Sequence, residues 1–340
     1  MYKEINFIDS GNQKRDKKQL LRLFFLIVFV VSIGIGALRL GLAYNEFTVM
    51  SDEQPFWSKV TAILSMSAIK TDPTPTPDDN RFNILVLGMR GLDDPDAIQG
   101  GMLTDTILLF SFDKTTKMSS LVSIPRDLYV KFNNTKTDKI NAVYEYGYAR
   151  KEGLEYSKRI FSIITGQYVD KVVVFDFSAF KKIIDEIGGI DIVLDKPFSE
   201  KSQWGSDFSL PAGPNHLDGE TALYFARSRY STSDFDRSRR QQQIIEAIKD
   251  RLLNIDLTSD PIKAFSLINL IRKDINTDIN LFNLSEIYDL VQDLKNAEPK
   301  RYVISTENLV YQTYVDNIYV LLPKNESFLE MHNLFNDILK

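Results

Sequence analysis

Five arginines lie within fourteen residues of this sequence, and they are its densest chemical signal: Arg227, Arg229, Arg237, Arg239 and Arg240. Each guanidinium presents a planar fork of donors that matches the oxygens of a phosphate. Ser233 or Asp234 could cap a following helix, whose N-terminus would add backbone donors and partial positive charge. The cluster therefore predicts a phosphate site; the alternative is a solvated basic loop with local arginine–aspartate pairs.

The helix expected from about Asp236 onward leads from this cluster into an apolar region. One stripe at spacings of three and four residues carries both kinds of side chain: Arg237, Gln241, Ile244, Ile245, Ile248 and Leu252. Arg237 and Gln241 are therefore expected to point inward, at the mouth of an apolar cleft. Such a surface suits an amphiphile with a phosphate head and a hydrocarbon tail.

Two further loops follow predicted strands and supply carboxylates and cations. The loop from Leu87 to Thr106 is rich in glycine and aspartate, and carboxylates at strand ends can hold Mg²⁺ against a phosphate. The segment from Ser123 to Asp127 contains Arg126, which could face the same end of the sheet. Lys139 opens the next predicted helix. Taken singly, each segment is typical of a structural turn or a helix start.

Composition excludes several classes of enzyme. The 340 residues include no cysteine and two histidines, His216 and His332. Thiol nucleophiles, iron–sulfur clusters, cysteine zinc sites and HExxH proteases are therefore excluded. Any chemistry must use carboxylates, arginine, lysine and hydroxyls, with a hard metal ion as a further option.

Short β-branched segments alternate with helical patterns, which predicts an α/β fold with helices on both faces of a sheet. The predicted strands are 83–87, 106–112, 119–124, 128–132, 171–175, 190–194 and 302–305. The predicted helices are 139–150, 153–164, 179–187, 221–229, 237–253, 281–294 and 326–339. Ser178 is expected to cap the helix at 179–187.

The N-terminal region predicts a membrane anchor. Residues 1–22 hold six basic and three acidic side chains, and residues 23–38 carry no charge. We expect a single transmembrane signal anchor at 20–43 with residues 1–19 in the cytoplasm, by the positive-inside rule. A cleaved signal peptide and a buried core helix are the alternatives.

The rest of the chain is expected outside the cell membrane. Residues 44–80 form a juxtamembrane segment and a proline-rich linker, and 81–340 form one extracytoplasmic domain. Residues 44–340 hold 34 basic and 43 acidic side chains, a net charge of −9, which disfavours nucleic acid as a partner.

Over about residues 81–255, the chain resembles the LytR–CpsA–Psr (LCP) family. The resemblance rests on blocks in family order: 103–106 (LTDT), 123–127 (SIPRD), 139–142 (KINA), 224–229 (YFARSR), 234–237 (DFDR) and 240–242 (RQQ). Segments 181–191 and 217–219 add support. The order of the blocks, together with a short tail and a single anchor, makes the resemblance specific.

The resemblance implies an LCP-type α–β–α sandwich with a central mixed sheet. It also implies a phosphotransferase that moves a glycopolymer, such as teichoic acid or capsule, from a polyprenyl-pyrophosphate carrier to peptidoglycan through a phosphodiester linkage. Mg²⁺ or Mn²⁺ is the implied cofactor. Asp105, Arg126 and Arg229 would be catalytic, and Asp105 with Asp93 would bind the metal. The pyrophosphate would be bound by Arg126, Lys139, Arg227, Arg229, Arg237, Arg240 and Gln241.

Two departures from the common family pattern concern the metal. Arg90 stands where many members have an aspartate, and Leu103-Thr-Asp105 replaces Arg-Ser-Asp. Asp93, with Asp94 behind it, is the candidate second carboxylate. A non-catalytic polyprenyl-phosphate-binding scaffold and a pyrophosphatase that releases the polymer to water are the rival functions. A transcription regulator is disfavoured, because only about 19 residues are expected in the cytoplasm.

Overall fold

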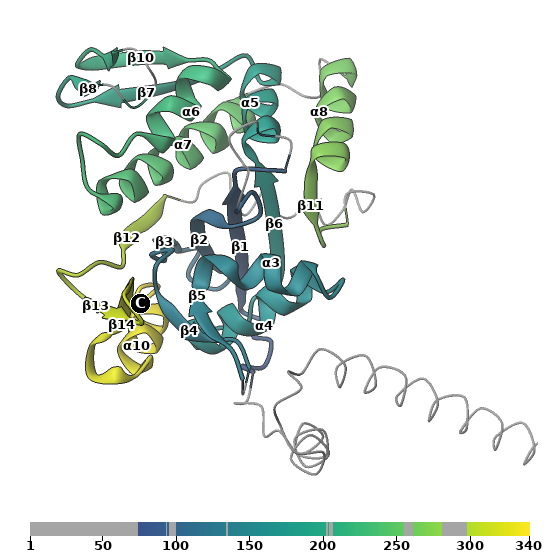
Figure 1. The fold of residues 1–340 in the computed structure, drawn as a ribbon. Coiled ribbons are helices and arrows are strands. Elements are labelled where there is room, and N and C mark those ends of the chain that lie inside the picture. Colours follow the sequence, from purple (N-terminus) through teal and green to yellow (C-terminus); the bar gives the residue numbers. More distant parts are fainter. Residues whose placement is uncertain are drawn as a thin grey trace, which may run out of the picture. The chain divides into compact units, whose positions relative to one another are not determined.

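A computed structural model describes residues 74–340 apart from 93, 95–99, 134, 202, 204–206, 255–260 and 281–297. Its centre is a six-stranded sheet in the order β11–β6–β1–β2–β3–β12 (Figure 1). These strands are β1 (Arg81–Met89), β2 (Thr104–Asp113), β3 (Ser119–Ser123), β6 (Lys171–Asp176), β11 (Ile275–Thr277) and β12 (Pro299–Val303). Strand β1 runs parallel to β6 and antiparallel to β2, so the predicted α/β class and mixed sheet are confirmed.

The described helices pack around this sheet and beyond one of its ends. They are α3 (Val143–Tyr148), α4 (Gly153–Thr165), α5 (Phe177–Glu186), α6 (Gly219–Arg227), α7 (Asp234–Asn254), α8 (Pro261–Asp274) and α10 (Leu329–Asp337). Four two-stranded sheets accompany them: β4 (Tyr129–Lys131) with β5 (Thr137–Lys139), β7 (Ile190–Leu194) with β10 (Gly213–Leu217), β8 (Phe198–Glu200) with β9 (Phe208–Leu210), and β13 (Val310–Val315) with β14 (Ile318–Pro323).

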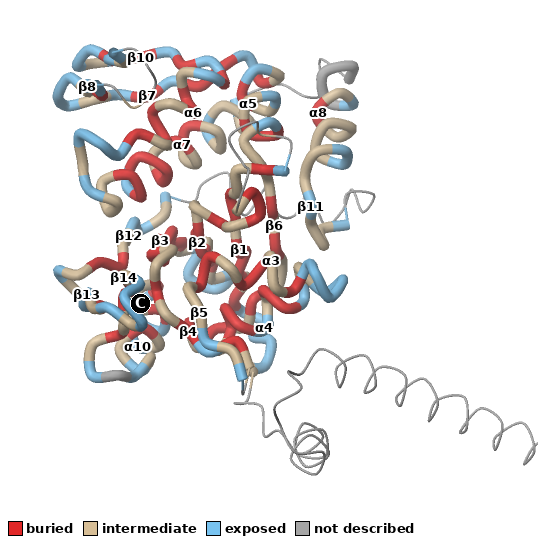
Figure 2. Tube along the Cα trace, in the orientation of Figure 1, coloured by how far each residue is buried: buried red, intermediate tan, exposed pale blue. Residues whose placement is uncertain are grey.

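Two apolar cores result. The larger joins sheet residues such as Leu85 and Val122 to α4 and to Phe335 of α10. The smaller joins α5, α6 and α7 to β7 and β10, around Ile184 and Phe225. Figure 2 shows buried segments both in the central strands and in α6 and α7. The candidate site lies where strand ends of the larger core meet the helices of the smaller core.

Side-chain caps set the starts of the helices near the site. Asp176 accepts a hydrogen bond from Ala179 N (2.8 Å), so the predicted Ser178 cap is wrong. The reason is that α5 begins directly after β6, and the last strand residue is the one that caps it. For α7, Ser233 Oγ accepts from Asp236 N (3.1 Å), as one of the two predicted caps requires. Asp234 is thereby left to face the candidate site.

All seven predicted strands are present; the strand at 190–194 has the predicted ends, and the ends of the others differ by at most three residues. The β13–β14 hairpin and several short strands were not predicted. The predicted anchor at 20–43 and the predicted helix at 281–294 lie outside the described residues, so the anchor and the complete α–β–α layering stay predictions. Within the described ranges, no helix has the length and apolar character needed to span a membrane.

Helix α7 is attached to the sheet by one buried amide. Gln242 Nε2 donates to Ser123 Oγ (2.7 Å), Tyr302 O (2.8 Å) and Leu121 O (3.2 Å). Gln242→Leu would leave these buried acceptors unpaired, at a cost of about 1–3 kcal/mol. We expect the melting temperature of the detergent-solubilised full chain to fall by several degrees. Gln243→Leu, at a half-buried neighbour whose amide donates to Val193 O (2.9 Å), should change it less; equal effects would contradict the role of Gln242.

Candidate functional site

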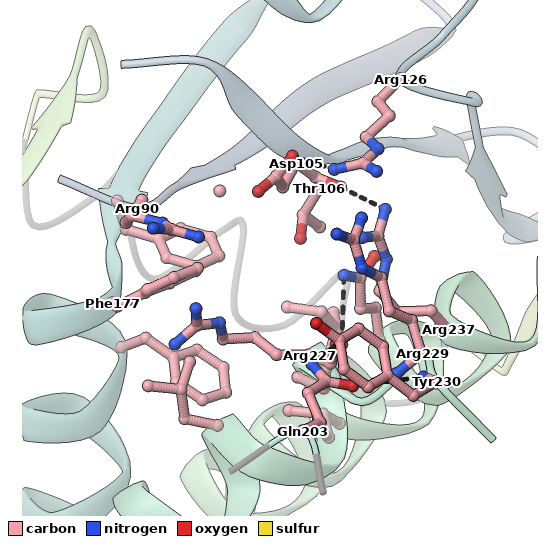
Figure 3. Close-up of a pocket in the computed structure, with 18 residues that line it drawn as sticks. Arg90, Asp105, Thr106, Arg126, Phe177, Gln203, Arg227, Arg229, Tyr230 and Arg237 are labelled. Atoms are coloured by element: carbon pink, nitrogen blue, oxygen red, sulfur yellow. Dashed lines mark hydrogen bonds and ion pairs between the residues drawn. The ribbon is translucent and has the colours of Figure 1, made fainter. Parts of the chain in front are cut away.

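A cavity of about 560 Å³ opens at the end of the central sheet, between the strands and α5, α6 and α7 (Figure 3). Its polar lining comprises Arg90, Asp105, Thr106, Arg126, Gln203, Arg227, Arg229, Tyr230, Arg237 and Gln241. Its apolar lining comprises Phe175, Phe177, Phe180, Leu223, Ala226, Ile244 and Ile245. In Figure 3, Arg90 and Arg227 lie on the side of Phe177, and Arg126, Arg229 and Arg237 lie on the opposite side.

A β-bulge directs Asp105 into this cavity. In the β1–β2 ladder Gly88 pairs with Thr106 and Met89 pairs with Thr104, so Asp105 is the extra residue. A bulge residue leaves the ladder and its side chain is re-aimed, and bulges are frequent beside active sites. The adjoining loop turns sharply at Gly91, where φ is +99° and a Cβ would lie 2.9 Å from Asp176 Cβ. Glycine at this position allows the close approach that places Arg90 at the cavity wall.

Arg126 is bound to Asp105 by an ion pair of 2.5 Å between Nη1 and Oδ1. It lies in the turn after β3, where Leu128 N donates to Pro125 O (3.1 Å) and Asn141 N to Arg126 O (3.3 Å). Burial disfavours its charge, but the carboxylates of Asp105, Asp234 and Asp127 outweigh burial and raise the pKa of Arg126. The guanidinium is therefore a permanent cation.

Arg237, in the first turn of α7, is 5% exposed. It pairs with Asp234 (2.9 Å) and donates to Asp105 O (3.3 Å), which ties α7 to the bulge. Burial lowers its pKa; Asp234 opposes this effect and the nearby Arg126 adds to it. The Nε atoms of Arg237 and Arg126 are buried and make no hydrogen bond to a described residue, although Arg126 Nε lies 3.7 Å from Asp127 Oδ2.

The loop that carries Arg229 is held by two buried charged side chains behind the cavity. Glu200 Oε2 accepts from Tyr230 N (3.0 Å) and Ser231 N (3.2 Å). Arg240 donates to Phe225 O (2.9 Å) and to Ser228 O. Burial lowers the pKa of Arg240 to about 10, against the opposing charge of Asp236. This anchoring presents the exposed Arg229 guanidinium to the cavity.

Apolar side chains line the cavity beside the arginines. Ile244 and Ile245 follow Arg237 and Gln241 along α7, as the predicted stripe requires. Opposite them, the Arg227 guanidinium carbon lies 4.2 Å from the centre of the Phe177 ring. The arrangement can bind a diphosphate at one end and a hydrocarbon chain at the other.

Most of the predicted site residues are brought together here: Asp105, Arg126, Arg227, Arg229, Arg237 and Gln241 all line the cavity. Arg240 is not among the lining residues, and its donors are engaged by the loop. Lys139 lies in a neighbouring cavity and pairs with Asp127 at 2.6 Å. Asp93 lies outside the described residues. Sequence reasoning missed Arg90, Thr106, Gln203 and Tyr230 as lining residues; the position of Arg90 directly after a strand was the available signal.

The described lining offers one carboxylate, Asp105, to a metal ion, and Asp105 is paired with Arg126. Among the described residues, no three His, Asp or Glu side chains group closely enough to hold a metal. Asp105 is the lining carboxylate of the cavity. Because Mg²⁺ is commonly bound by one or two carboxylates plus substrate phosphates, Asp105 with a bound pyrophosphate would supply such ligands.

The sequence model described as the LytR_cpsA_psr family matches residues 56–337. The chain belongs to the LytR–CpsA–Psr family. The resemblance on which the sequence interpretation rested is thus confirmed, and the match extends beyond residue 255, where no motif was recognised.

Relatives in this family include two transferases of Bacillus subtilis (strain 168). TagV, a polyisoprenyl-teichoic acid–peptidoglycan teichoic acid transferase, is 32% identical over 242 residues, which are 69% of this chain and 58% of TagV. TagT, a transferase of the same description, is 24% identical over 305 residues, 86% of this chain and 88% of TagT. The regulatory protein MsrR of Staphylococcus aureus (strain COL) is 31% identical over 60% of this chain and 58% of MsrR.

Solved structures agree on the LytR–CpsA–Psr fold. The crystal structure of B. subtilis TagV superposes with a TM-score of 0.60 at 26% identity, covering 77% of this chain and 98% of that one. TagT bound to LIIa-WTA superposes with a TM-score of 0.59 at 22% identity, covering 79% and 95%. The central six-stranded sheet is therefore that of an LCP domain.

Arg229 provides a test of the phosphate site, because it is exposed and its replacement should not disturb packing. We expect Arg229→Gln to weaken the binding of inorganic pyrophosphate to the full chain about ten- to 100-fold, the value of a charged hydrogen bond. Isothermal titration calorimetry measures this. Arg239→Gln is the matched control: Arg239 is also exposed but is paired with Asp236 and is not a lining residue. Equal losses in both variants would indicate nonspecific charge attraction and not a site.

Proposed function

We propose that this protein is a membrane-anchored phosphotransferase that moves a glycopolymer from a polyprenyl-pyrophosphate carrier to peptidoglycan. The observation that carries the proposal is the cavity whose lining combines several arginines with apolar side chains of α5, α6 and α7. A polyprenyl-pyrophosphoryl glycan has both matching parts, a doubly charged head and a long hydrocarbon tail. The names of the relatives TagV and TagT, teichoic acid transferases, support the same reaction class.

In this proposal the pyrophosphate lies among the arginines of the cavity. Arg126 and Arg237 supply guanidinium donors on one side, and Arg227 and Arg229 complete the basic lining. The polyprenyl chain follows Ile244 and Ile245 along α7. Arg240 acts indirectly, since it holds the loop that carries Arg229.

The reaction is a substitution at the sugar-proximal phosphorus. An acceptor hydroxyl oxygen forms the new P–O bond, the bond to the bridging oxygen breaks, and polyprenyl phosphate leaves with its electron pair. The product is a phosphodiester, and the hydroxyl proton passes to a base. Arg126 and Arg229 stabilise the negative charge that grows on the bridging and non-bridging oxygens. Asp105 is the candidate both for a metal ligand and for the base.

Asp105 would hold Mg²⁺ or Mn²⁺ against the pyrophosphate, with Asp93 as a proposed second ligand. The ion would supply Lewis-acid stabilisation of the phosphate oxygens. In this chain Arg90 adds a fixed positive charge to the same cavity, so part of that neutralisation is already present in the protein.

The cellular setting is part of the proposal. Residues 20–43 would anchor the chain in the cell membrane with residues 1–19 in the cytoplasm, and the residues from 81 onward would act outside. The polyprenyl carrier and the growing wall are both available on that side of the membrane.

The transfer reaction itself is testable with the purified full chain, a short polyprenyl-pyrophosphoryl glycan and uncrosslinked peptidoglycan. We expect Asp105→Asn to slow phosphodiester formation at least about 100-fold, as for loss of one group acting on the developing charge. Asp337→Asn, an exposed aspartate paired with Lys340, is the control. Mass spectrometry identifies the product. Free sugar phosphate would favour the pyrophosphatase, and tight carrier binding without turnover would favour the scaffold.

Arg90 generates a separate prediction about the metal. Arg90→Asp would remove a positive charge and place a second carboxylate beside the site of Asp105. We expect the Mg²⁺ concentration for half-maximal transfer to fall about tenfold or more, since added carboxylates tighten binding of a hard cation. Arg90→Gln separates loss of charge from gain of a ligand. An unchanged Mg²⁺ requirement in Arg90→Asp would contradict a metal ion at this position.

A further inference from the structure

A second cavity, of about 600 Å³, adjoins the first and shares Asp105 and Arg126 with it. Its other charged lining residues are Asp127, Lys136, Asp138, Lys139, Glu145 and Arg150. The charges are mixed in sign and partly paired: Lys136 Nζ lies 3.4 Å from Asp138 and Lys139 Nζ lies 2.6 Å from Asp127. This lining differs from the arginines and apolar side chains of the first cavity. It therefore suits a different ligand, one with hydroxyl, amide and carboxylate groups.

The β13–β14 hairpin reaches the edge of this second cavity, where Ile318 is one of its lining residues. Tyr314 and Tyr319 pair directly across the two strands, with ring centres 6.0 Å apart. Tyr314 is 71% exposed, and Lys139 Nζ lies 5.9 Å from the centre of the Tyr319 ring. The exposed Tyr314 and the half-buried Tyr319 therefore stand beside the charged cavity, which is an arrangement that suits a ring-shaped, partly polar ligand.

The hairpin is held in register with the reaction centre. Its turn residues Asp316 and Asn317 both have positive φ, as a tight two-residue hairpin turn requires. At its base, Leu321 N donates to Asp127 O (2.9 Å), and Leu321 forms a bridge with Leu128. Asp127 directly follows Arg126, whose guanidinium lines both cavities. The hairpin is therefore hydrogen-bonded to the turn that carries this guanidinium.

From this juxtaposition we propose that the second cavity, together with Tyr314 and Tyr319 of the β13–β14 hairpin, binds the acceptor glycan strand. The inference rests on the proposed function. A displacement at phosphorus brings the nucleophile to the side opposite the leaving group, so donor and acceptor must meet at one point from different directions. Asp105 and Arg126 are the point that the two cavities share. A sugar ring would stack on Tyr314, and Lys136 and Lys139 would face the carboxylates of the peptide stems.

A lipid chain or a polyanion would fit this cavity less well than a glycan strand. A second lipid chain would need an apolar wall, but Ile318 and Leu103 are the large aliphatic side chains of the lining. A second polyanion would meet the carboxylates of Asp127, Asp138 and Glu145. The Tyr146 ring does not offer a stacking face, because the Arg150 guanidinium lies 3.5 Å from its centre and Lys136 Nζ lies 5.1 Å from it.

The hairpin carries its own matched pair of variants. Tyr314 lies on the face that includes Tyr319, and Tyr311 lies on the opposite face, since alternate residues of a strand point to opposite sides. With the full chain, we expect Tyr314→Ala to raise the KM for uncrosslinked glycan strands about three- to tenfold, the value of one aromatic contact. Affinity for inorganic pyrophosphate should stay unchanged. Tyr311→Ala should leave both constants unchanged.

Direct binding keeps this test independent of turnover. Co-sedimentation of the full chain with purified peptidoglycan should weaken in Tyr314→Ala by a similar factor and persist in Tyr311→Ala. Unchanged acceptor KM and unchanged co-sedimentation in Tyr314→Ala would overturn the hairpin proposal and leave the transferase proposal standing. Weakened co-sedimentation with no phosphodiester formed by the unaltered chain would support glycan binding and overturn the transferase.

Discussion

The candidate site depends on keeping several guanidinium groups close together before any anion arrives. Arg237 is buried, and both burial and the nearby charge of Arg126 lower its pKa, so its charge needs compensation. Asp105 and Asp234 supply the compensation: Asp105 pairs with Arg126, Asp234 pairs with Arg237, and Arg126 also lies 3.8 Å from Asp234. Asp234, an acidic residue within the basic cluster, thus belongs to the candidate site and not merely to its solvated surroundings.

This constraint explains why three distant segments must meet. The bulge in β2 supplies Asp105, the turn after β3 supplies Arg126, and the first turn of α7 supplies Asp234 and Arg237. The buried amide of Gln242 sets the distance between α7 and the sheet. Behind the cavity, the charged side chains of Glu200 and Arg240 form hydrogen bonds to backbone atoms in and beside the loop that carries Arg229. The charged side chains of α7 therefore include one that lines the cavity, Arg237, and one that supports the neighbouring loop, Arg240.

Helical periodicity predicted much of this division. Residues Arg237 and Gln241 are one turn apart and both line the cavity, and Arg239, about 200° around the helix from Arg237, is exposed. Arg240 lies only about 60° from Arg237, and periodicity alone could not assign it to the loop carbonyls. The bulge at Asp105 depends on the register between two strands, which no single segment encodes. The direction of the Lys139 side chain likewise depends on a tertiary contact, its ion pair with Asp127.

Two cavities that meet at one ion pair impose a geometric order on the proposed reaction. Asp105 contributes to both walls, so any group that binds it on one side changes the charge presented to the other. Because Leu321 is hydrogen-bonded to the residue after Arg126, the C-terminal hairpin and this ion pair are linked through a single turn. In the proposed reaction, the distance between the hairpin residues that contact the acceptor and the Arg126 guanidinium would then stay constant. This link gives the region beyond residue 255, which carried no recognised motif, a direct connection to the turn that carries Arg126.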